Sequence, residues 1–454
     1  MNIKYNSKKI QKGDTFIALK TNNDGHKYIN DAIKNGATKV VAEYGSYPVE
    51  TLLVDNTKEY LVKYLYENYY QEIKDLKLIG ITGTNGKTTT CMLLHNMLNM
   101  LGRKTAYIGT NGFYINKFIK ELPNTTPEIL DIYELLIEAK KEGCEFVCIE
   151  ASSHGLAQNR LENLKFDYAI FTNLTHEHLG YHKTMKNYAL AKQKLFTMLR
   201  NNKYAIINND DNYKNYFILK ENNNITYSLN NGNYYVKEYK ITTQNNIFTV
   251  VNNNKEYTFT TKLLGKHNIY NSLASIIVLN KIGYSFEEIN NVLTIVSGPK
   301  GRMENISYNN NNIIIDYAHT PDGIANVLNT AKELHPNKII TIVGCGGGTG
   351  SDRTKRSEMG NLVLSISDKT IFTNDNPRDE DPNQIINDLL KEKINNNYII
   401  ELDRKKAINK GINMLTNNDI LLILGKGHEN YQIIGHNKTH FNDKETVLEI
   451  TKEK

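Results

Sequence analysis

A single glycine-rich turn, placed between an apolar strand and a helix, constrains this chain more than any other feature. The run Leu76–Thr82 predicts a strand, Gly83-Thr84-Asn85-Gly86-Lys87-Thr88 predicts a loop, and a helix is predicted from Thr89 onward. Glycines let backbone N–H groups close around phosphate oxygens, the helix N-terminus and Lys87 add positive charge, and the Thr88 hydroxyl can ligate Mg²⁺. Strict Walker A spacing would need glycine at Ile81. A glycine turn that binds no phosphate is the alternative, and because no guanine-reading N-K-x-D motif occurs, the predicted nucleotide is ATP.

The alternation of apolar runs and amphipathic stretches predicts an α/β fold in three domains, which suits 454 residues at roughly 100 to 200 residues per domain. We expect a small α/β domain over residues 1–75, a central P-loop domain with a parallel sheet over 76–298, and a Rossmann-like domain over 299–454. The second boundary rests on the Gly/Pro-rich stretch Ser297–Arg302. Between about Thr226 and Leu264, period-two alternation with Asn and Gly turns predicts antiparallel hairpins appended to the central sheet.

The individual elements follow from the lengths and periods of the apolar runs. The predicted strands are Thr15–Leu19, Lys39–Glu43, Leu76–Thr82, Glu145–Ala151, Asp167–Asn173, Lys203–Asn208, Ile313–Tyr317, Lys338–Gly344, Lys369–Thr373 and Ile420–Gly425. The predicted helices lie near Tyr28–Asn35, Lys58–Tyr70, Lys87–Leu101, Pro127–Glu142, Lys186–Arg200, Gly323–Leu334, Pro382–Lys391 and Arg404–Leu415. In a parallel sheet, ligands bind outside the carboxyl ends of the strands, so we expect the site there.

Composition narrows the class of protein. The 55 Lys and Arg residues outnumber the 49 Asp and Glu residues, which gives a net charge of 55 − 49 = +6. Because the sequence also has no long basic block, binding to nucleic acid or to a membrane surface is not expected. The longest apolar runs are too short to cross a bilayer, and the N-terminus has no apolar stretch typical of a signal peptide. The 4 cysteines form no C-x-x-C pair, which suits a reducing cytosol. We therefore expect a cytoplasmic protein, and we expect it to be a monomer.

Further motifs accompany the phosphate loop along nearly the whole chain. In order they are GDTFIALK (13–20), NTTP (124–127), EASSHGLAQNR (150–160), FTNLTHEHLGYH (171–182), ALAK (189–192), GKHNIYNSLA (265–274), GRME (301–304), DYAHTPDG (316–323), DNPR (375–378) and GKGHE (425–429). With the loop TGTNGKT, this set resembles the Mur ligases, cytosolic ATP-dependent enzymes that add amino acids to the peptidoglycan precursor. Within that family it is most similar to the tripeptide synthetases (MurE type), and DNPR resembles members that take meso-2,6-diaminopimelate rather than L-lysine.

The resemblance implies an amide-bond ligase that adds a third residue, expected to be meso-diaminopimelate, to UDP-N-acetylmuramoyl-L-alanyl-D-glutamate through an acyl phosphate. Phosphorylating the carboxylate creates a leaving group that the amine can displace, so positioning and electrostatics dominate the catalysis. The implied cofactors are ATP, Mg²⁺ and CO₂ for lysine carbamylation. The first domain would bind the UDP moiety, and the third would deliver the diamino acid.

The resemblance also assigns roles to single residues. It implies Lys87, Glu150, His178 and Lys192 as catalytic residues, and Thr88, Glu150, His178 and carbamylated Lys192 (N6-carboxylysine) as Mg²⁺ ligands. The implied ATP-binding residues are Gly83, Thr84, Asn85, Gly86, Lys87, Thr88, Thr89, Asn268, Asn271, Arg302 and Asp316, with His267 beside the adenine. The implied substrate-binding residues are Ser7, Thr125, Thr126, Ser152, Gln158, Arg160, Arg353, Asp375, Asn376, Pro377, Arg378, Gly425 and Glu429.

Simpler roles stay open on the residues alone. Glu150 could be a solvated carboxylate, His178 a core histidine and Lys192 a solvent-exposed lysine, while Asn376-Pro377 suits a type I turn. A hydrolytic pair of Ser152 or Ser153 with His154 is disfavoured, because adjacent residues at a strand end point apart and no Gly-x-Ser-x-Gly elbow occurs.

Two departures from the family pattern bear on the substrate. The family's N-terminal domain usually starts earlier, whereas Asn6-Ser7-Lys8 lies almost at the terminus here. The family's Gly-Cys-Gly-Gly-Asp-Arg is replaced by the longer run Gly344–Arg353, so the arginine expected to bind the incoming carboxylate is displaced and Arg353 is the nearest candidate. The alternatives are the same ligase acting on L-lysine or another diamino acid, a folylpolyglutamate-synthetase-like ligase, and a non-catalytic ATP-binding scaffold.

Overall fold

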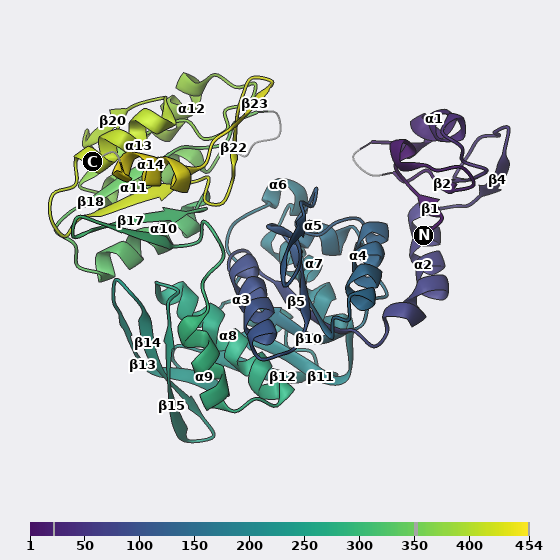
Figure 1. Ribbon diagram of the computed structural model, residues 1–454, viewed down its shortest axis with the longest axis horizontal. Helices are drawn as coiled ribbons and strands as arrows, with labels where there is room; N and C mark the ends of the chain where they lie inside the picture. The colour runs from purple at the N-terminus through teal and green to yellow at the C-terminus, as the bar shows by residue number, and fades with distance from the viewer. Residues whose placement is uncertain (21–22, 349–352, 453–454) are drawn as a thin grey trace.

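The computed structural model describes residues 1–20, 23–348 and 353–452. Figure 1 shows three α/β bodies: a small N-terminal one set apart at the end of helix α2 (Thr57–Ile73), a central one, and a C-terminal one. Each β-sheet lies within one of the three predicted domains. The prediction of a three-domain α/β fold is confirmed, while the residue boundaries between the domains stay predictions.

The N-terminal sheet has four parallel strands in the order β1 (Ile3–Lys4), β2 (Thr15–Ile17), β3 (Lys39–Ala42) and β4 (Glu50–Leu53). Two 3₁₀ turns (Ser7–Lys9 and Gly25–Tyr28) and α1 (Ile29–Lys34) pack beside it. A small apolar core, including Phe16, Val40 and Ile29, joins sheet and helix. The sequence predicted β2, β3, α1 and α2, whereas β1 is too short and β4 too exposed to give a strand pattern.

The central sheet is 11-stranded, and the strand that precedes the phosphate loop lies in its interior. Its order is β15 (Lys255–Thr261), β14 (Asn246–Asn252), β13 (Tyr234–Ile241), β12 (Asn223–Ser228), β11 (Leu199–Asn208), β10 (Phe166–Phe171), β5 (Lys77–Thr82), β9 (Phe146–Glu150), β6 (Thr105–Gly109), β7 (Gly112–Ile115) and β8 (Lys117–Lys120). Strand β5 pairs in parallel with β10 and β9, so the segments after all three meet at one edge of the sheet.

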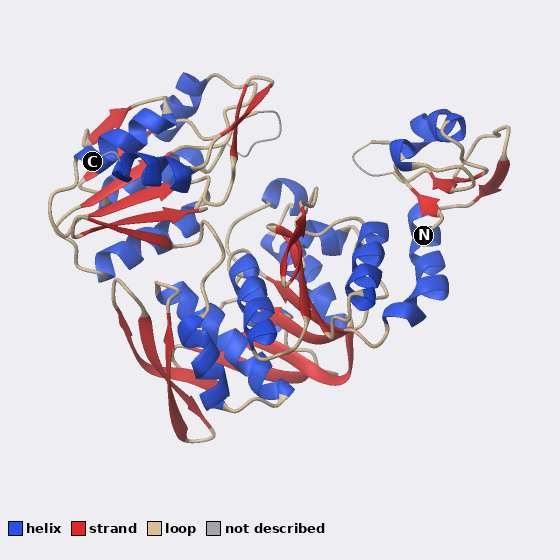
Figure 2. Ribbon diagram, viewed as in Figure 1, coloured by secondary structure: helices blue, strands red, loops and turns tan. Residues whose placement is uncertain are grey.

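Helices cover both faces of this sheet (Figure 2). One core contains side chains of α4 (Ile129–Lys141) and α7 (Met185–Thr197), and the other contains side chains of α3 (Lys87–Met100), α8 (Lys266–Ile282) and α9 (Phe286–Ile295). Shorter helices α5 (Ser153–Ala157), α6 (Leu179–His182) and a 3₁₀ turn (Lys214–Tyr216) lie in the connections.

Two local predictions for the central domain need correction. The predicted helix Lys186–Arg200 ends at Thr197, because Leu199 already begins the long strand β11. The hairpins β13–β14 and β14–β15 are antiparallel as predicted, but β12 joins β13 in parallel.

The C-terminal sheet is 6-stranded, in the order β16 (Glu304–Tyr308), β17 (Asn311–Asp316), β21 (Ile420–Leu424), β18 (Ile339–Val343), β19 (Lys369–Phe372) and β20 (Tyr398–Ile400). Only the edge strand β16 pairs antiparallel among these. Helices α10 (Pro321–Glu333), α11 (Arg356–Ile366), α12 (Pro382–Leu389), α13 (Arg404–Asn413) and α14 (Asp443–Lys452) pack against it, and a hairpin of β22 (Tyr431–Ile434) and β23 (Asn437–His440) follows β21. No helix in the described part of the chain combines the length and apolar character that a membrane span requires.

Candidate active site

The phosphate loop is held in shape by the segment that follows β10. Thr84 N donates to Asn173 O at 2.8 Å, and Asn85 N donates to Asn173 Oδ1 at 2.9 Å. A Cβ atom at Gly83 would lie 1.8 Å from Thr172 Oγ1, so only glycine fits this close approach. Lys87 Nζ donates to Gly83 O at 2.8 Å and to Thr84 O at 2.7 Å. The loop is therefore preformed around its own lysine.

Glu150 is buried at the carboxyl end of β9, beside the first turn of α3. Its oxygens accept hydrogen bonds from Thr88 Oγ1 at 2.9 Å, from Tyr107 OH at 2.5 Å and from Thr110 N at 3.0 Å. A solvated carboxylate is thus the wrong description of Glu150. The adjacent hydroxyl and carboxylate oxygens are ligand types that fit Mg²⁺. Within residues 1–20, 23–348 and 353–452 no group of three or more His, Cys, Asp or Glu side chains is arranged to hold a metal ion.

His178 lies in the loop after β10 as predicted, at the N-terminus of α6 and in the left-handed backbone region with φ 56°. Its Nε2 atom is 3.6 Å from Glu177 Oε2, and its side chain is 44% exposed. His178 is therefore not a core histidine, and its role as a metal ligand stays a prediction.

Lys192 is only 1% exposed, which rules out the solvent-exposed alternative. Its Nζ donates to Gly83 O at 2.7 Å and lies 4.6 Å from the centre of the Tyr188 ring. Burial, together with the nearby charge of Lys87, lowers the pKa of Lys192 well below its ordinary value. An unprotonated amine directly under the phosphate loop is the form that reacts with CO₂, so this environment suits the implied carbamate.

Arg160, expected to bind an anion of the substrate, already has a carboxylate partner. Its Nε lies 2.9 Å from Glu128 Oε1, its Nη1 donates to Thr126 O at 2.8 Å, and its Nη2 donates to Gln158 Oε1 at 2.6 Å. Lys58 Nζ, at the start of α2, lies 3.5 Å from the other Glu128 oxygen. The two ion pairs of Glu128, with Lys58 and with Arg160, connect helix α2, which carries the N-terminal domain, to the predicted substrate site.

Thr126 and Ser152 form a hydrogen-bonded group behind Glu150. Thr126 Oγ1 donates to Glu150 O at 2.7 Å and accepts from Ser152 N at 3.0 Å. Ser152 Oγ caps α5 by accepting from Gly155 N at 3.1 Å, so this hydroxyl has a structural role and not that of a nucleophile. Thr125 Oγ1 lies 3.0 Å from Thr110 Oγ1. Ser7 is buried in the N-terminal domain, and Figure 1 shows that domain set apart from the central one.

The residues expected beside the adenine join α8 to α3. Asn271 Nδ2 donates to Asn268 Oδ1 at 2.9 Å, and Thr90 Oγ1 donates to Asn271 Oδ1 at 3.2 Å. Both asparagines are buried next to the helix that follows the phosphate loop. Burial lowers the pKa of His267 to about 4, so its imidazole is neutral at physiological pH.

The third domain also reaches the phosphate loop. Asn85 Nδ2 donates to Asp322 Oδ2 at 2.5 Å, from the first turn of α10. The Arg302 guanidinium stacks 4.8 Å from the centre of the Tyr317 ring. Asp316 accepts from Met303 N and Ala318 N, both at 2.7 Å, and so fixes the backbone near Arg302. Their contacts with nucleotide stay predictions.

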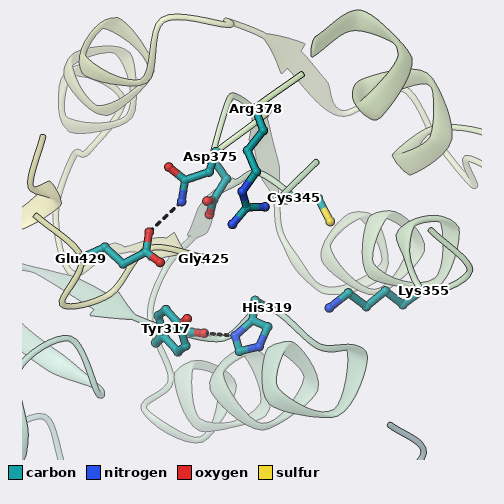
Figure 3. A pocket seen from close by; sticks show the side chains of 10 residues that line it. Tyr317, His319, Cys345, Lys355, Asp375, Arg378, Gly425 and Glu429 are labelled. Atoms are coloured by element: carbon teal, nitrogen blue, oxygen red, sulfur yellow. Dashed lines mark hydrogen bonds between the residues drawn. The ribbon is translucent and has the colours of Figure 1, made fainter. Parts of the chain in front are cut away.

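A cavity of about 200 Å³ lies at the carboxyl edge of the C-terminal sheet (Figure 3). It is lined by Tyr317, His319, Cys345, Gly346, Lys355, Asp375, Asn376, Arg378, Gly425 and Glu429. Burial raises the pKa of Asp375. Glu429 Oε2 accepts from Asn376 Nδ2 at 2.8 Å and from Lys426 Nζ at 2.9 Å. The structure thus brings Asp375, Asn376, Arg378, Gly425 and Glu429 together in one cavity.

Arg378 enters this cavity from an unusual backbone position. Its φ is 53°, in the left-handed region that disfavours residues other than glycine. Hydrogen bonds hold it there, since Arg378 N donates to Ile433 O at 3.1 Å and Gly435 N donates to Arg378 O at 2.6 Å. Nη1 donates to Gly347 O at 2.7 Å, which leaves the other nitrogens of the guanidinium able to bind a carboxylate. Backbone strain of this kind concentrates at functional sites.

The glycine-rich loop after β18 packs directly on DNPR. A Cβ atom at Gly347 would lie 2.4 Å from Pro377 O. Residues 349–352 of this longer run lie outside the described ranges. Arg353 is 60% exposed and its Nη2 lies 3.2 Å from Glu380 Oε1, while Lys355 lines the cavity. The role of Arg353 as a substrate ligand stays a prediction.

Comparison with known proteins identifies the family of this arrangement. The model for the Mur ligase middle domain matches residues 81–279, and the model for the Mur ligase glutamate ligase domain matches residues 301–427. The chain is 40% identical to a UDP-N-acetylmuramoyl-L-alanyl-D-glutamate–2,6-diaminopimelate ligase of Fusobacterium nucleatum, over 98% of this chain and 92% of the relative. The chain belongs to the Mur ligase family.

Two further matches agree with this assignment. A ligase of the same description from Clostridium perfringens is 39% identical over 99% of this chain and 94% of that relative. A solved structure of a ligase with that description has a TM-score of 0.70 and 31% identity, covering 99% of this chain and 94% of that one. The resemblance inferred from the motifs is confirmed, and with it the assignment as a Mur-type ligase rather than a non-catalytic scaffold.

Several residues of this Mur ligase site were not singled out from the sequence. Tyr107 and Thr110 hold Glu150, Glu128 pairs with Arg160, and Lys355 lines the cavity. These roles depend on contacts between distant segments, for which the sequence carries no local signal. Tyr317, His319 and Asp322 lie within the quoted motif DYAHTPDG, so that motif offered a signal for them.

Proposed function

We propose that this Mur ligase adds meso-2,6-diaminopimelate to UDP-N-acetylmuramoyl-L-alanyl-D-glutamate. The observation that carries the proposal is the cavity of the third domain, which presents the cations Arg378 and Lys355 and the carboxylates Asp375 and Glu429. Diaminopimelate has a carboxylate and an amino group at each end, so its charges complement this set. The relatives at 40% and 39% identity are named as 2,6-diaminopimelate ligases, which supports the same choice.

In the proposed reaction, the D-glutamate side-chain or main-chain carboxylate that is to be extended attacks the terminal phosphorus of ATP. ADP leaves, and the resulting acyl phosphate is attacked by the amine, which releases phosphate and a proton. The residues of this chain bind and orient the partners: Lys87 and the loop amides face the phosphates, and Arg160 faces the anionic dipeptide. Thr88 and Glu150 would hold Mg²⁺, with His178 and carbamylated Lys192, and the ion would neutralise phosphate charge.

The first domain is proposed to bind the UDP moiety and the third to deliver the amino acid. The contact between Asn85 and Asp322 supports closure of the third domain over the phosphate loop, which would exclude water from the acyl phosphate. The four-stranded domain formed by β1 to β4 precedes the phosphate loop and argues against the folylpolyglutamate-synthetase-like alternative, which normally begins close to that loop. A cytoplasmic location and a monomeric state stay predictions.

The test is product formation from defined components. The protein is incubated with ATP, Mg²⁺, the muramoyl dipeptide and either diaminopimelate or L-lysine, and the product is weighed by mass spectrometry. We expect the diaminopimelate adduct, and we expect phosphate release only when all components are present. A lysine adduct in excess at equal concentrations would overturn the substrate assignment, and rapid hydrolysis of ATP alone would indicate an ATPase.

A further inference from the structure

Three basic side chains lie between β18 and the first residue of α11, namely Arg353, Lys355 and Arg356, and ion pairs occupy two of them. Arg353 pairs with Glu380 at 3.2 Å. The fully buried Arg356 donates to Glu380 at 2.7 and 2.8 Å and to Asp388 at 2.8 Å. Lys355 makes no ion pair with a residue of the described ranges. Lys355 is therefore the one cation among these three described side chains that is available to a ligand.

Lys355 also lies on a different side of the cavity from Arg378. Figure 3 shows Lys355 and His319 on one side of the cavity, and Arg378, Asp375 and Glu429 on the other. Glu429 is already neutralised by Lys426, whose side chain is fully buried. The cavity carboxylates are thus grouped around Arg378, and Lys355 faces none of them in an ion pair.

The side of the cavity that holds Lys355 faces the central domain. His319, on the same side of the cavity, lies just before α10. Asp322, in the first turn of α10, accepts a hydrogen bond from Asn85 Nδ2 of the phosphate loop at 2.5 Å. Lys355 therefore lies between the amino-acid cavity and the site of phosphate chemistry. Since α11 begins directly after Lys355, the positive end of that helix adds to its charge.

The direction of a bound diamino acid follows from this placement. The amine that is coupled must approach the acyl group activated in the central domain, so the reacting end of the amino acid lies toward Lys355. The carboxylate beside that amine then needs a cation on this side, because burying it without a partner is costly. The far carboxylate lies toward Arg378.

We propose that Lys355 binds the carboxylate beside the amine that is coupled, so that Lys355 and Arg378 each bind one of the two carboxylates of the diamino acid. This assignment rests on the proposed function, and it gives Lys355 the role first expected for Arg353. It predicts that specificity for a substrate with two carboxylates is determined by two cations on different sides of the cavity.

The two enantiomers of lysine provide the matched probes. Meso-diaminopimelate has one centre of each configuration, so removing either carboxylate gives one enantiomer of lysine, which keeps the other end intact. One enantiomer therefore lacks the carboxylate assigned to Lys355, and the other lacks the carboxylate assigned to Arg378. Both are used as substrates or as competitive inhibitors of diaminopimelate, with wild type, Lys355→Met, Lys355→Arg, Arg378→Ala and the surface control Lys391→Met.

Lys355→Met should lower kcat/KM for diaminopimelate by about tenfold to a hundredfold, the size of one charge-assisted hydrogen bond, mainly through KM for the amino acid. Lys355→Met should weaken the binding of one lysine enantiomer and leave the binding of the other unchanged. Arg378→Ala should affect the opposite enantiomer. Lys355→Arg should recover part of the loss, and Lys391→Met should behave as wild type. Circular dichroism checks that each variant is folded.

The outcomes separate the two proposals. If wild type forms no product with diaminopimelate, the proposed function fails. If wild type forms it and Lys355→Met has normal kcat/KM, or weakens both enantiomers equally, the assignment of Lys355 fails alone. A rise in KM for ATP with an unchanged KM for the amino acid would show that Lys355 binds phosphate instead, and would also overturn it.

Discussion

Removing the Arg404 side chain should destabilise the third domain by about 3 to 5 kcal/mol, because it leaves a buried carboxylate without its partner. The guanidinium donates to the two oxygens of Asp443 at 2.7 and 2.8 Å, and both side chains are 0% exposed. It also donates to Asn374 O at 3.3 Å and to Leu424 O at 3.0 Å. These carbonyls directly precede Asp375 and Gly425, so Arg404→Met should also loosen the two strand ends that carry the amino-acid cavity.

The assay is native-state hydrogen exchange of the amides in β19 and β21, since a three-domain chain is not expected to unfold in one step. At 1.4 kcal/mol per decade, Arg404→Met should raise the opening constant of these strands about a hundredfold to a few thousandfold. Arg404→Met combined with Asp443→Leu removes both charges and should recover most of the loss. A single variant that loses less than about 1 kcal/mol, or a double variant as unstable as the single one, would refute this reasoning.

Three further results are expected. Lys192→Ala should lose most ligase activity while the fold survives, and short carboxylic acids should restore part of it by replacing the carbamate under the phosphate loop; near-normal rates in the variant would exclude that role. Arg378→Ala should cut kcat/KM for diaminopimelate by about tenfold to over a hundredfold and barely change that for L-lysine, as measured in competition assays; an equal loss on both would show that Arg378 does not read the second carboxylate. The hydrogen bonds from Arg356 lower the pKa of Glu380 from its ordinary 4.5 to about 2. The stability that this carboxylate contributes is therefore complete above pH 4.5 and is lost as the pH falls toward 2. Glu380→Gln should therefore be less stable than wild type at neutral pH and equal to it in strong acid. Hydrogen exchange of the α11 amides at both pH values checks this, and a difference that does not depend on pH would contradict the proposed cause.

The sequence predicted the parallel sheets and the phosphate loop because both depend on local patterns. Strands such as Ile339–Val343 and Ile420–Leu424 are buried on both faces and read as continuous apolar runs. The edge strand Lys117–Lys120 is exposed along its whole length, so it carries no such signal and was not predicted. Helix Lys266–Ile282 is buried over much of its length, with polar Asn and Ser side chains among its buried residues, so it lacks the one-sided apolar pattern of a surface helix.

The candidate site was predictable as far as motifs reach, and no further. Lys192 could be named from its motif, but its burial beneath Gly83 depends on the packing of α7 against β5. The partners of Arg160 and Arg356 lie far away in the sequence, so their ion pairs could not be derived from spacing. Lys355 follows a segment that departs from the family motif, so no motif predicted that its side chain lines the cavity.

The left-handed backbone at Arg378 has a consequence for mutational libraries. Most L-residues lose about 1 to 2 kcal/mol at this φ, whereas glycine loses none and asparagine tolerates it better than most, so the native arginine is not the residue that the backbone prefers. A library selected for thermal resistance should enrich glycine and asparagine at position 378. A library selected for ligase activity should return arginine. Alanine keeps the backbone cost and removes the side chain beyond Cβ, guanidinium included, so unlike glycine it does not change the backbone preference at the same time.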